Sequence, residues 1–207
     1  MIYVGIDPGN NGAIVGIDES YRTVAAECMP LIDIGKGKKH KWVLDKVAVL
    51  RVLKDLSYLS QPGPDVLLRN LFVVLEKAQV MGGAGGRSPA SPRAMFQYGR
   101  GFGGWEMALM ALEIPHAVVH PRTWGKVLSG IEGSDSKARA ILKCQRALPT
   151  LDLTPGRKRK PHDGLADAGC MALHAMTLRP VPGLVIPTPP SVRQSIAPLP
   201  PPPPLRR

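Results

Sequence analysis

Four carboxylates stand where the surrounding sequence would gather them at one place. Asp7 and Glu76 each end an apolar run that is typical of a buried strand. Asp163 and Asp167 are four residues apart in an Ala- and Leu-rich segment, so they share one face of a helix. Like charges this close are tolerable around cations, and carboxylate oxygens suit Mg²⁺ or Mn²⁺. Two such ions about 4 Å apart can activate water and stabilise both oxygens of a phosphodiester displacement.

Each acid also has an ordinary structural role to weigh against this chemistry. Asp7 suits the turn that begins at Pro8-Gly9, and Glu76 suits an ion pair with a nearby cation. Asp163 is a good helix N-cap, and Asp167 lies in the first turn, where a negative charge is favourable. These roles explain the acids singly, whereas the metal site explains all four together.

The elements that must position these acids follow an α/β order. Strand-like apolar runs alternate with segments in which apolar residues recur at helical spacing. The pattern predicts a mixed sheet flanked by helices, with a basic loop at 36–41 and an exposed Gly-rich loop at 81–93. We expect strands at 2–7, 13–18, 22–29, 71–75 and 117–119, and helices at 42–59, 104–112, 136–147 and 163–178.

Net charge indicates the class of partner. The 207 residues hold 27 Lys and Arg against 16 Asp and Glu, a formal net charge of +11, which favours a polyanionic partner. Residues 179–207 contain eleven prolines and four arginines, and we expect them to form a disordered tail in extended polyproline II conformation. The remaining 23 basic and 16 acidic residues leave +7 on residues 1–178, the expected folded domain.

Cysteine usage and hydropathy indicate the compartment. The three cysteines are widely spaced, which argues against a disulfide framework or a thiolate metal site. No run of 18 apolar residues occurs. We expect a cytoplasmic protein with no membrane partner.

Several stretches together resemble the RuvC-like Holliday junction resolvases, particularly their bacteriophage and prophage branch. They are IDPGNNGAIVGID, LEKAQVMGG, the block FQYGRGFGGWEMALMALEIPHAVVHPRTWGKVL and KPHDGLADA, within a match from about Met1 to Leu178. The resemblance implies an RNase H-like fold with a five-stranded sheet and a homodimer. It also implies two Mg²⁺ ions per active site, with Mn²⁺ as a substitute, and symmetric nicking of four-way DNA junctions.

The resemblance carries over to the acids one by one. Asp7 matches the family's first-strand aspartate, Glu76 its central-strand glutamate and Asp167 its last-helix aspartate. Asp163 is assigned as the fourth ligand, although RuvC spaces its last two aspartates by three residues rather than four. His162 is either a further ligand or water-positioning group, or a solvated histidine before the helix.

Basic and aromatic residues near these motifs are expected to hold DNA. A basic run immediately precedes the last helix, and other cations surround the Pro-Arg-Thr-Trp-Gly-Lys turn and the Gly-rich loop, where phosphate contact would make binding salt-dependent. Phe96 and its neighbour Tyr98 have a base-stacking rationale. Solvated surface charge, and packing against the Trp105 helix, are the alternatives. The predicted DNA-binding residues are Arg87, Arg93, Phe96, Arg122, Lys126, Lys137, Arg157, Lys158, Arg159 and Lys160.

The leading hypothesis is therefore a Mg²⁺-dependent endonuclease that resolves four-way or other branched DNA and leaves 5′-phosphate and 3′-hydroxyl ends. A non-catalytic junction-binding protein is the first alternative, and it would gain nothing from acids where phosphate must sit. An actin-like ATPase or sugar kinase is the second alternative. It rests on the opening strand and Gly-containing turn alone, and about 178 residues are too few for its two lobes.

Overall fold

The computed structural model describes residues 1–37, 39–60, 70–78, 91–157 and 159–178. The expected tail at 179–207 and most of the expected Gly-rich loop at 81–93 lie outside the described residues. The boundary between domain and tail at residue 178 therefore stays a prediction.

A five-stranded mixed sheet forms the centre of the molecule. The middle strand β1 (Ile2–Ile6) runs antiparallel to β2 (Ala13–Asp18) and parallel to β6 (Leu71–Glu76). The edge strands are β3 (Thr23–Cys28) beside β2 and β7 (His116–Val119) beside β6. The predicted α/β fold, a mixed five-stranded sheet flanked by helices, is confirmed.

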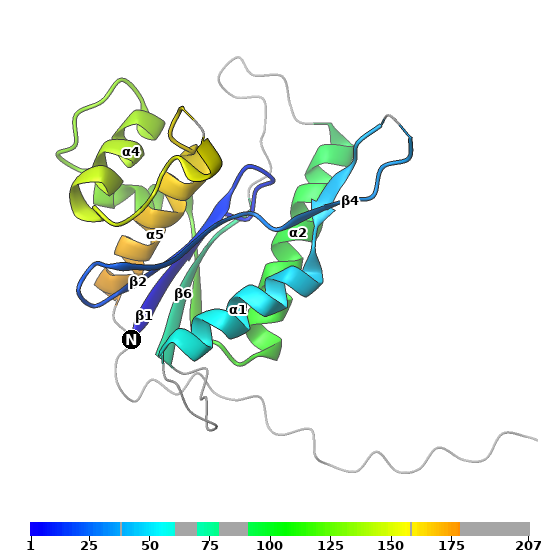
Figure 1. The fold of residues 1–207 in the computed structure, drawn as a ribbon, viewed down its shortest axis with the longest axis horizontal. Helices are drawn as coiled ribbons and strands as arrows, with labels where there is room; N and C mark the ends of the chain where they lie inside the picture. Colours follow the sequence, from blue (N-terminus) through cyan, green and yellow to red (C-terminus); the bar gives the residue numbers. More distant parts are fainter. Residues whose placement is uncertain (38, 61–69, 79–90, 158, 179–207) are drawn as a thin grey trace, which may run out of the picture.

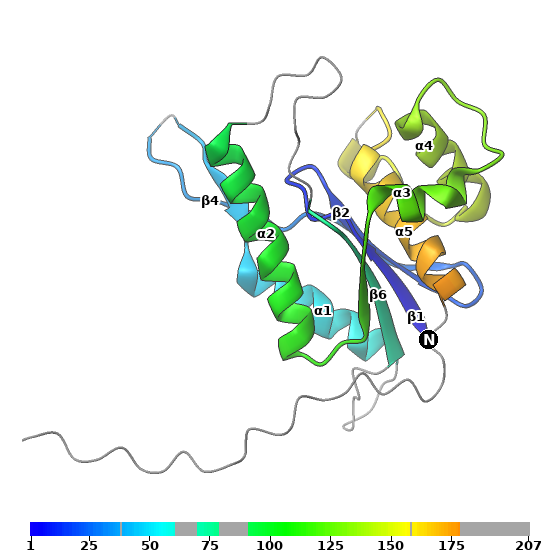
Figure 2. The same cartoon turned by 180° about the vertical axis from the view of Figure 1, so that it is seen from behind.

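Helices cover both faces of this sheet. Figures 1 and 2 show α1 and α2 on one face and α4 and α5 on the other. Within the described part of the chain, no helix is long and apolar enough to cross a membrane. The helices are α1 (Lys46–Ser60), α2 (Pro92–Ala111), α3 (Pro121–Trp124), α4 (Ser136–Ala147) and α5 (Asp163–Leu178), with 3₁₀ turns at Gly125–Leu128 and Pro155–Arg157.

Burial on both faces explains why the central strands are apolar throughout. Ile2, Val4 and Ile6 of β1 belong to the core beneath α1 and α2. Tyr3, on the opposite face of the same strand, belongs to the core beneath α4 and α5. A strand covered on both sides has no solvent-facing positions, so its sequence lacks polar alternation and its first polar residue marks the edge of the sheet.

Two helix starts differ from the sequence predictions. Trp42–Leu44 was expected to begin a helix, but it forms strand β5, which pairs with β4 (Leu31–Asp33) in a two-stranded sheet. The helix begins after Asp45, whose Oδ1 accepts hydrogen bonds from the amides of Val47 and Ala48. Apolar residues recur at helical spacing on both sides of Asp45, so the spacing did not indicate that the helix begins there. The predicted helix start at residue 42 was therefore wrong.

The second difference concerns α2, which begins at Pro92 rather than at residue 104. The Ser91 hydroxyl accepts a hydrogen bond from the amide of Ala94, and Pro92 occupies the first helical position. The first turns of this helix are largely exposed and contain three glycines, so they lack the apolar periodicity that marks a buried helix.

Gly5 lets α5 lie directly against β1, and this close approach gives a first testable prediction. A Cβ at Gly5 would lie 2.0 Å from the carbonyl oxygen of Ala168 and 2.6 Å from the amide nitrogen of Ala172. Because both atoms are backbone, the helix must move, and we expect Gly5→Ala to lower the free energy of unfolding by about 3 kcal/mol or more. Denaturant unfolding measures this loss.

The matched control is Gly103→Ala, in α2. A Cβ there meets nothing within 4 Å, so alanine should stabilise the helix by up to about 1 kcal/mol. Equal effects of the two substitutions would contradict the close packing of α5 on β1.

Candidate active site

Asp7 and Glu76 lie side by side at one edge of the sheet. The strands β1 and β6 are parallel, and Ile6 pairs with Leu75 in their register. The residues that follow this pair, Asp7 after Ile6 and Glu76 after Leu75, are therefore carboxylates at the carboxyl ends of their strands. Both apolar runs therefore end at the same edge of the sheet, and their acids meet there.

Asp167 comes to the same edge because α5 packs closely on the strands. A Cβ at Gly164, in the first turn of α5, would lie 2.2 Å from the carbonyl oxygen of Asn11. The helix therefore begins against the turn between β1 and β2, the turn that also carries Asp7. Residue 167 is one helical turn further on, where the charge of Asp7 raises its pKa.

Burial raises the pKa of all three carboxyls, and the charge of Asp7 adds to the rise at Glu76 and Asp167. Burial raises the pKa of Asp7. Three groups oppose this rise: the amide of Gly9, which donates to Oδ1 of Asp7 at 3.1 Å, and the nearby charges of His162 and Lys137. Burial and then the charge of Asp7 raise the pKa of Glu76 to about 7. Burial and then Asp7 raise the pKa of Asp167 to about 7. The three groups therefore form one negative centre, the carboxylate trio.

The chemistry of the trio fits divalent cations. Half-buried carboxylates that repel one another are stabilised by a cation between them, and their hard oxygen atoms suit Mg²⁺ or Mn²⁺. Among the residues that the structure describes, no group of three or more His, Cys, Asp or Glu side chains closes around a single ion position. Asp7, Glu76 and Asp167 are the residues that would hold metal at this edge.

Asp163 and His162 lie at the start of α5 with partners of their own. Asp163 is 44% exposed, and its Oδ2 accepts from Nζ of Lys137 at 2.5 Å. The amide of Leu165 donates to Nδ1 of His162 at 3.3 Å, so this histidine caps the helix. The charge of Asp163 still reaches Asp167 and that of His162 reaches Asp7. Their roles as fourth ligand and as ligand or water-positioning group stay predictions.

Trp124 is a residue of this site that sequence reasoning missed. It lies at the end of α3, immediately after β7, whose Val119 pairs with Glu76. Its indole Nε1–H donates to Oε2 of Glu76 at 2.7 Å, and the side chain is only 7% exposed. The signal was available, because a buried tryptophan beside a sheet edge needs an acceptor for its N–H.

Of the cations predicted to hold DNA, Lys137 lies close enough to the trio for its charge to act on Asp7 and Asp167. Arg122 lies in α3 and Lys126 in the following 3₁₀ turn, while Lys137 begins α4 and reaches Asp163. Arg159 and Lys160, both exposed, lie just before α5. Each of these residues lies at a helix start, in a short helical turn or in a loop. The same element or the neighbouring one carries one of the acids or Trp124.

Arg93 and Phe96 lie on the exposed first turns of α2. The guanidinium of Arg100 lies 5.8 Å from the centre of the Phe96 ring, which is itself 65% exposed, so Phe96 does not pack into the core. Arg87 and Lys158 lie outside the described residues, as does the side chain of Arg157.

The raised pKa values predict that the metal-free protein loses stability as pH rises. Unfolded Glu and Asp have pKa values near 4, whereas Glu76 and Asp167 reach about 7 in the fold. The folded state therefore binds more protons between about pH 4 and 7, and stability falls as pH rises through this window. We expect each group to contribute on the order of 1–3 kcal/mol.

Denaturant unfolding in EDTA at pH 5 and pH 8 measures this effect, and Glu76→Gln should remove a large part of it. Gln keeps an oxygen that can accept from Trp124 while it removes the charge. Glu113→Gln is the control, because Glu113 is exposed just before β7, at the opposite end of the parallel strands. An unchanged pH dependence in Glu76→Gln would contradict the buried, repelling trio.

Comparison with known proteins finds similarity only at the level of solved structures. No protein-family model matches the chain, and no curated protein matches it. The structure is similar to a Thermus thermophilus RuvC structure, with 19% identity over 86% of this chain and 96% of that chain and a TM-score of 0.47. It is also similar to T. thermophilus RuvC in complex with a Holliday junction substrate, with 15% identity, 86% and 95% coverage and a TM-score of 0.48.

Proposed function

We propose that this protein is a divalent-metal-dependent endonuclease of branched DNA, a RuvC-like Holliday junction resolvase. The observation that supports it most is the carboxylate trio of Asp7, Glu76 and Asp167, half-buried at one sheet edge with the exposed Lys137 close enough to act on Asp7 and Asp167. The motifs that resemble this family include all three acids. A negative centre within a chain of net charge +11 suits a substrate whose phosphates bind cationic side chains and bridging metal ions.

The residues have distinct roles in this proposal. Asp7, Glu76 and Asp167 would hold the metal, which supplies an activated water and stabilises the attacking and leaving oxygens when bound. The amide of Gly9 and the indole of Trp124 each donate to one trio carboxylate and so fix its orientation. Arg122, Lys126 and the basic residues before α5 neutralise the DNA backbone and position it over the trio.

Paired, symmetric nicking requires two active sites related by a two-fold axis, so we propose that the working form is a homodimer. The products would be nicked duplexes with 5′-phosphate and 3′-hydroxyl ends. A non-catalytic junction-binding protein is disfavoured, because a binder that lacks metal would hold three buried carboxylates against the phosphates it must attract.

The test is cleavage of a labelled four-way junction by purified protein with Mg²⁺, Mn²⁺ or EDTA. We expect symmetric nicks with either metal, none in EDTA, and much slower cleavage of linear duplex of the same sequence. Junction binding without metal-dependent products would support the non-catalytic alternative and overturn the proposed nuclease.

A further inference from the structure

A lysine-rich hairpin projects from the domain beside the start of α2, as Figures 1 and 2 show. This segment, the basic hairpin, comprises β4, β5 and the turn between them, from Leu31 to Leu44. Its residues 34–41 contain four lysines and no Asp or Glu. None of these lysines is among the predicted DNA-binding residues, and none of those that the structure describes forms an ion pair. Like charges therefore lie together here without a partner in the described part of the chain.

The register of the basic hairpin places its described lysines on one face. Asp33 lies opposite Trp42 in the paired strands. Lys36 lies opposite Lys39, three positions further along both strands, and Gly37 adopts a left-handed conformation (φ 63°) at the turn. Because side chains alternate between faces, an odd step of three puts this lysine pair on the face opposite to Asp33. The described residues of that face, the lysine face, are Ile32, Ile34, Lys36, Lys39, Lys41 and Val43, and none is acidic.

The other face of the basic hairpin holds its two strands together. Oδ2 of Asp33 bonds to Nδ1 of His40 at 2.5 Å, and Oδ1 accepts from the amides of Gly35 and Lys41. The bond with His40, and then those amides, hold the pKa of Asp33 below its usual range. His40 also stacks on Trp42, with ring planes 13° apart. The single acid of residues 31–44 thus joins the strands, and the lysine face is presented on an ordered support rather than on a free loop.

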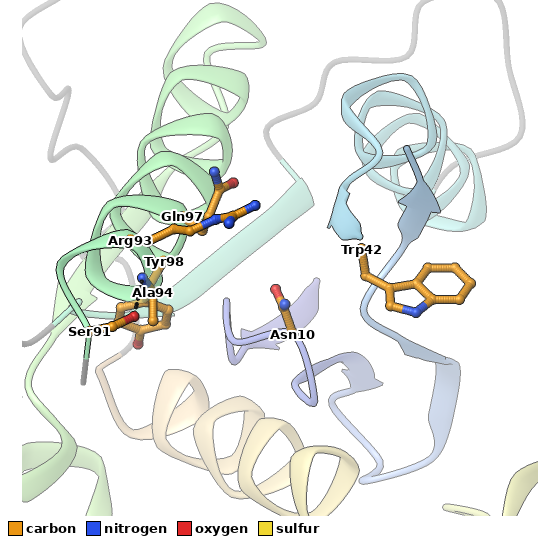
Figure 3. Close-up of a pocket in the computed structure, with 7 residues that line it drawn as sticks. All are labelled: Asn10, Trp42, Ser91, Arg93, Ala94, Gln97 and Tyr98. Carbon is orange, nitrogen blue, oxygen red and sulfur yellow. Dashed lines mark hydrogen bonds between the residues drawn. The ribbon is translucent and has the colours of Figure 1, made fainter. Parts of the chain in front are cut away.

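A cavity connects the base of the basic hairpin with the surroundings of the carboxylate trio. It measures about 340 Å³, and Trp42, Asn10 and the start of α2 line it. Figure 3 shows that the Trp42 indole points away from Asn10 and from the α2 residues. Tyr98, from the same wall of α2, is close enough to Glu76 and Asp7 for their charges to raise its pKa. No carboxylate is among the described residues that line the cavity, so DNA that leaves the trio on this side meets neutral and cationic side chains there.

We propose that the lysine face of the basic hairpin binds the sugar–phosphate backbone of a duplex arm of branched DNA, away from the phosphate that is cut. The proposal rests on the proposed function and adds a second DNA contact to it. From Asp33 to the turn at Gly37 the hairpin extends four residues, about 13 Å, so its tip reaches several base pairs beyond its base. A duplex arm presents phosphates along its whole length, and lysine binds them as a point charge without reading bases. The contact therefore adds affinity that does not depend on DNA sequence.

The first test measures binding of a four-way junction in Ca²⁺, so that no strand is cut, over a range of salt concentrations. The hairpin variant, Lys36→Gln with Lys39→Gln, should bind about tenfold more weakly, and its plot of log K against log salt should be shallower by about 2, one for each lost phosphate contact. The control is the α1 variant, Arg51→Gln with Lys54→Gln, which removes the same charge from exposed positions of α1. It should bind within about twofold of the parent with the parent's slope, because distant exposed charges are screened.

The second test locates the contact with single uncharged methylphosphonate linkages, placed one at a time along the junction arms. At linkages several base pairs from the branch, the parent should lose affinity, whereas the hairpin variant should lose little more because the same contact is already absent. Parent-like binding by the hairpin variant, equal losses in the hairpin and α1 variants, or coupling confined to the cleaved linkage would overturn the proposed contact. If the parent still cuts junctions with Mg²⁺, the proposed function stands without it. A parent protein that neither binds nor cuts branched DNA would overturn both.

Discussion

Replacing Asp7 by Asn should lower metal-dependent cleavage of a four-way junction on the order of a thousandfold or more, while junction binding in Ca²⁺ or EDTA stays within a few-fold of the parent. After burial, the charge of Asp7 is the largest cause that raises the pKa of both Glu76 and Asp167, so Asp7 lies close to both of them. Removing its charge takes away a ligand near both neighbours and leaves the metal poorly held. Asn keeps a carbonyl oxygen that can accept from the amide of Gly9.

The measurement is single-turnover cleavage with saturating protein, so that binding does not limit the rate. Asp55→Asn is the matched control, because Asp55 is an exposed residue of α1 and lies outside the trio. The metal-free Asp7→Asn protein should also be more stable than the parent at pH 8, since the repulsion within the trio is relieved. Cleavage at the parent rate would remove Asp7 from the catalytic site and with it the metal assignment.

The carboxylates at the sheet edge were predictable from the sequence, because burial makes the strands that precede them apolar throughout. A strand covered on both faces is apolar to its last residue, so the first carboxylate after it stands out, as Asp7 and Glu76 do. The start of α5 was predictable for a related reason, since polar residues give way to an Ala-, Leu- and Met-rich run at Asp163. These signals are local, and each lies within one element.

The partners of the acids were less predictable because they depend on distant packing. The indole of Trp124 reaches Glu76 across 48 positions of sequence, and Lys137 reaches Asp163 across 26. Lys137 was predicted as a DNA contact, and its ion pair with Asp163 is visible only in the fold. Trp42 shows the same limit, because its spacing matched a helix although it lies in a strand that faces the start of α2.

The fold gathers three acidic side chains at one place and leaves basic side chains exposed around the domain, which composition alone does not reveal. The net charge of +11 indicates attraction for a polyanion, yet the groups with raised carboxyl pKa values lie together at one sheet edge. Exposed cations such as Arg122 and Lys160 lie on the neighbouring elements. Under the proposed function, a polyanion would be attracted over the basic surface, while a phosphate would approach the trio only together with divalent metal.

Trp124→Phe should weaken metal binding by about ten- to a hundredfold while the protein still folds. Phenylalanine keeps most of the buried ring but loses the N–H that donates to Oε2 of Glu76. That hydrogen bond opposes the rise of the Glu76 pKa, so its loss should raise this pKa further above the usual range. Cleavage should then need more Mg²⁺, and its acidic limb should move to higher pH.

Trp105→Phe provides a matched control for Trp124→Phe. Trp105 is fully buried on the opposite face of the sheet, and its Nε1–H donates to Sδ of Met29 rather than to a carboxylate. Both substitutions make the same chemical change and cost packing, so both should lower the melting temperature. Only Trp124→Phe should reduce the rise in melting temperature on Mn²⁺ addition and shift the pH profile. If the two variants bind Mn²⁺ equally well, Trp124 is a packing residue and orientation of Glu76 depends on other contacts.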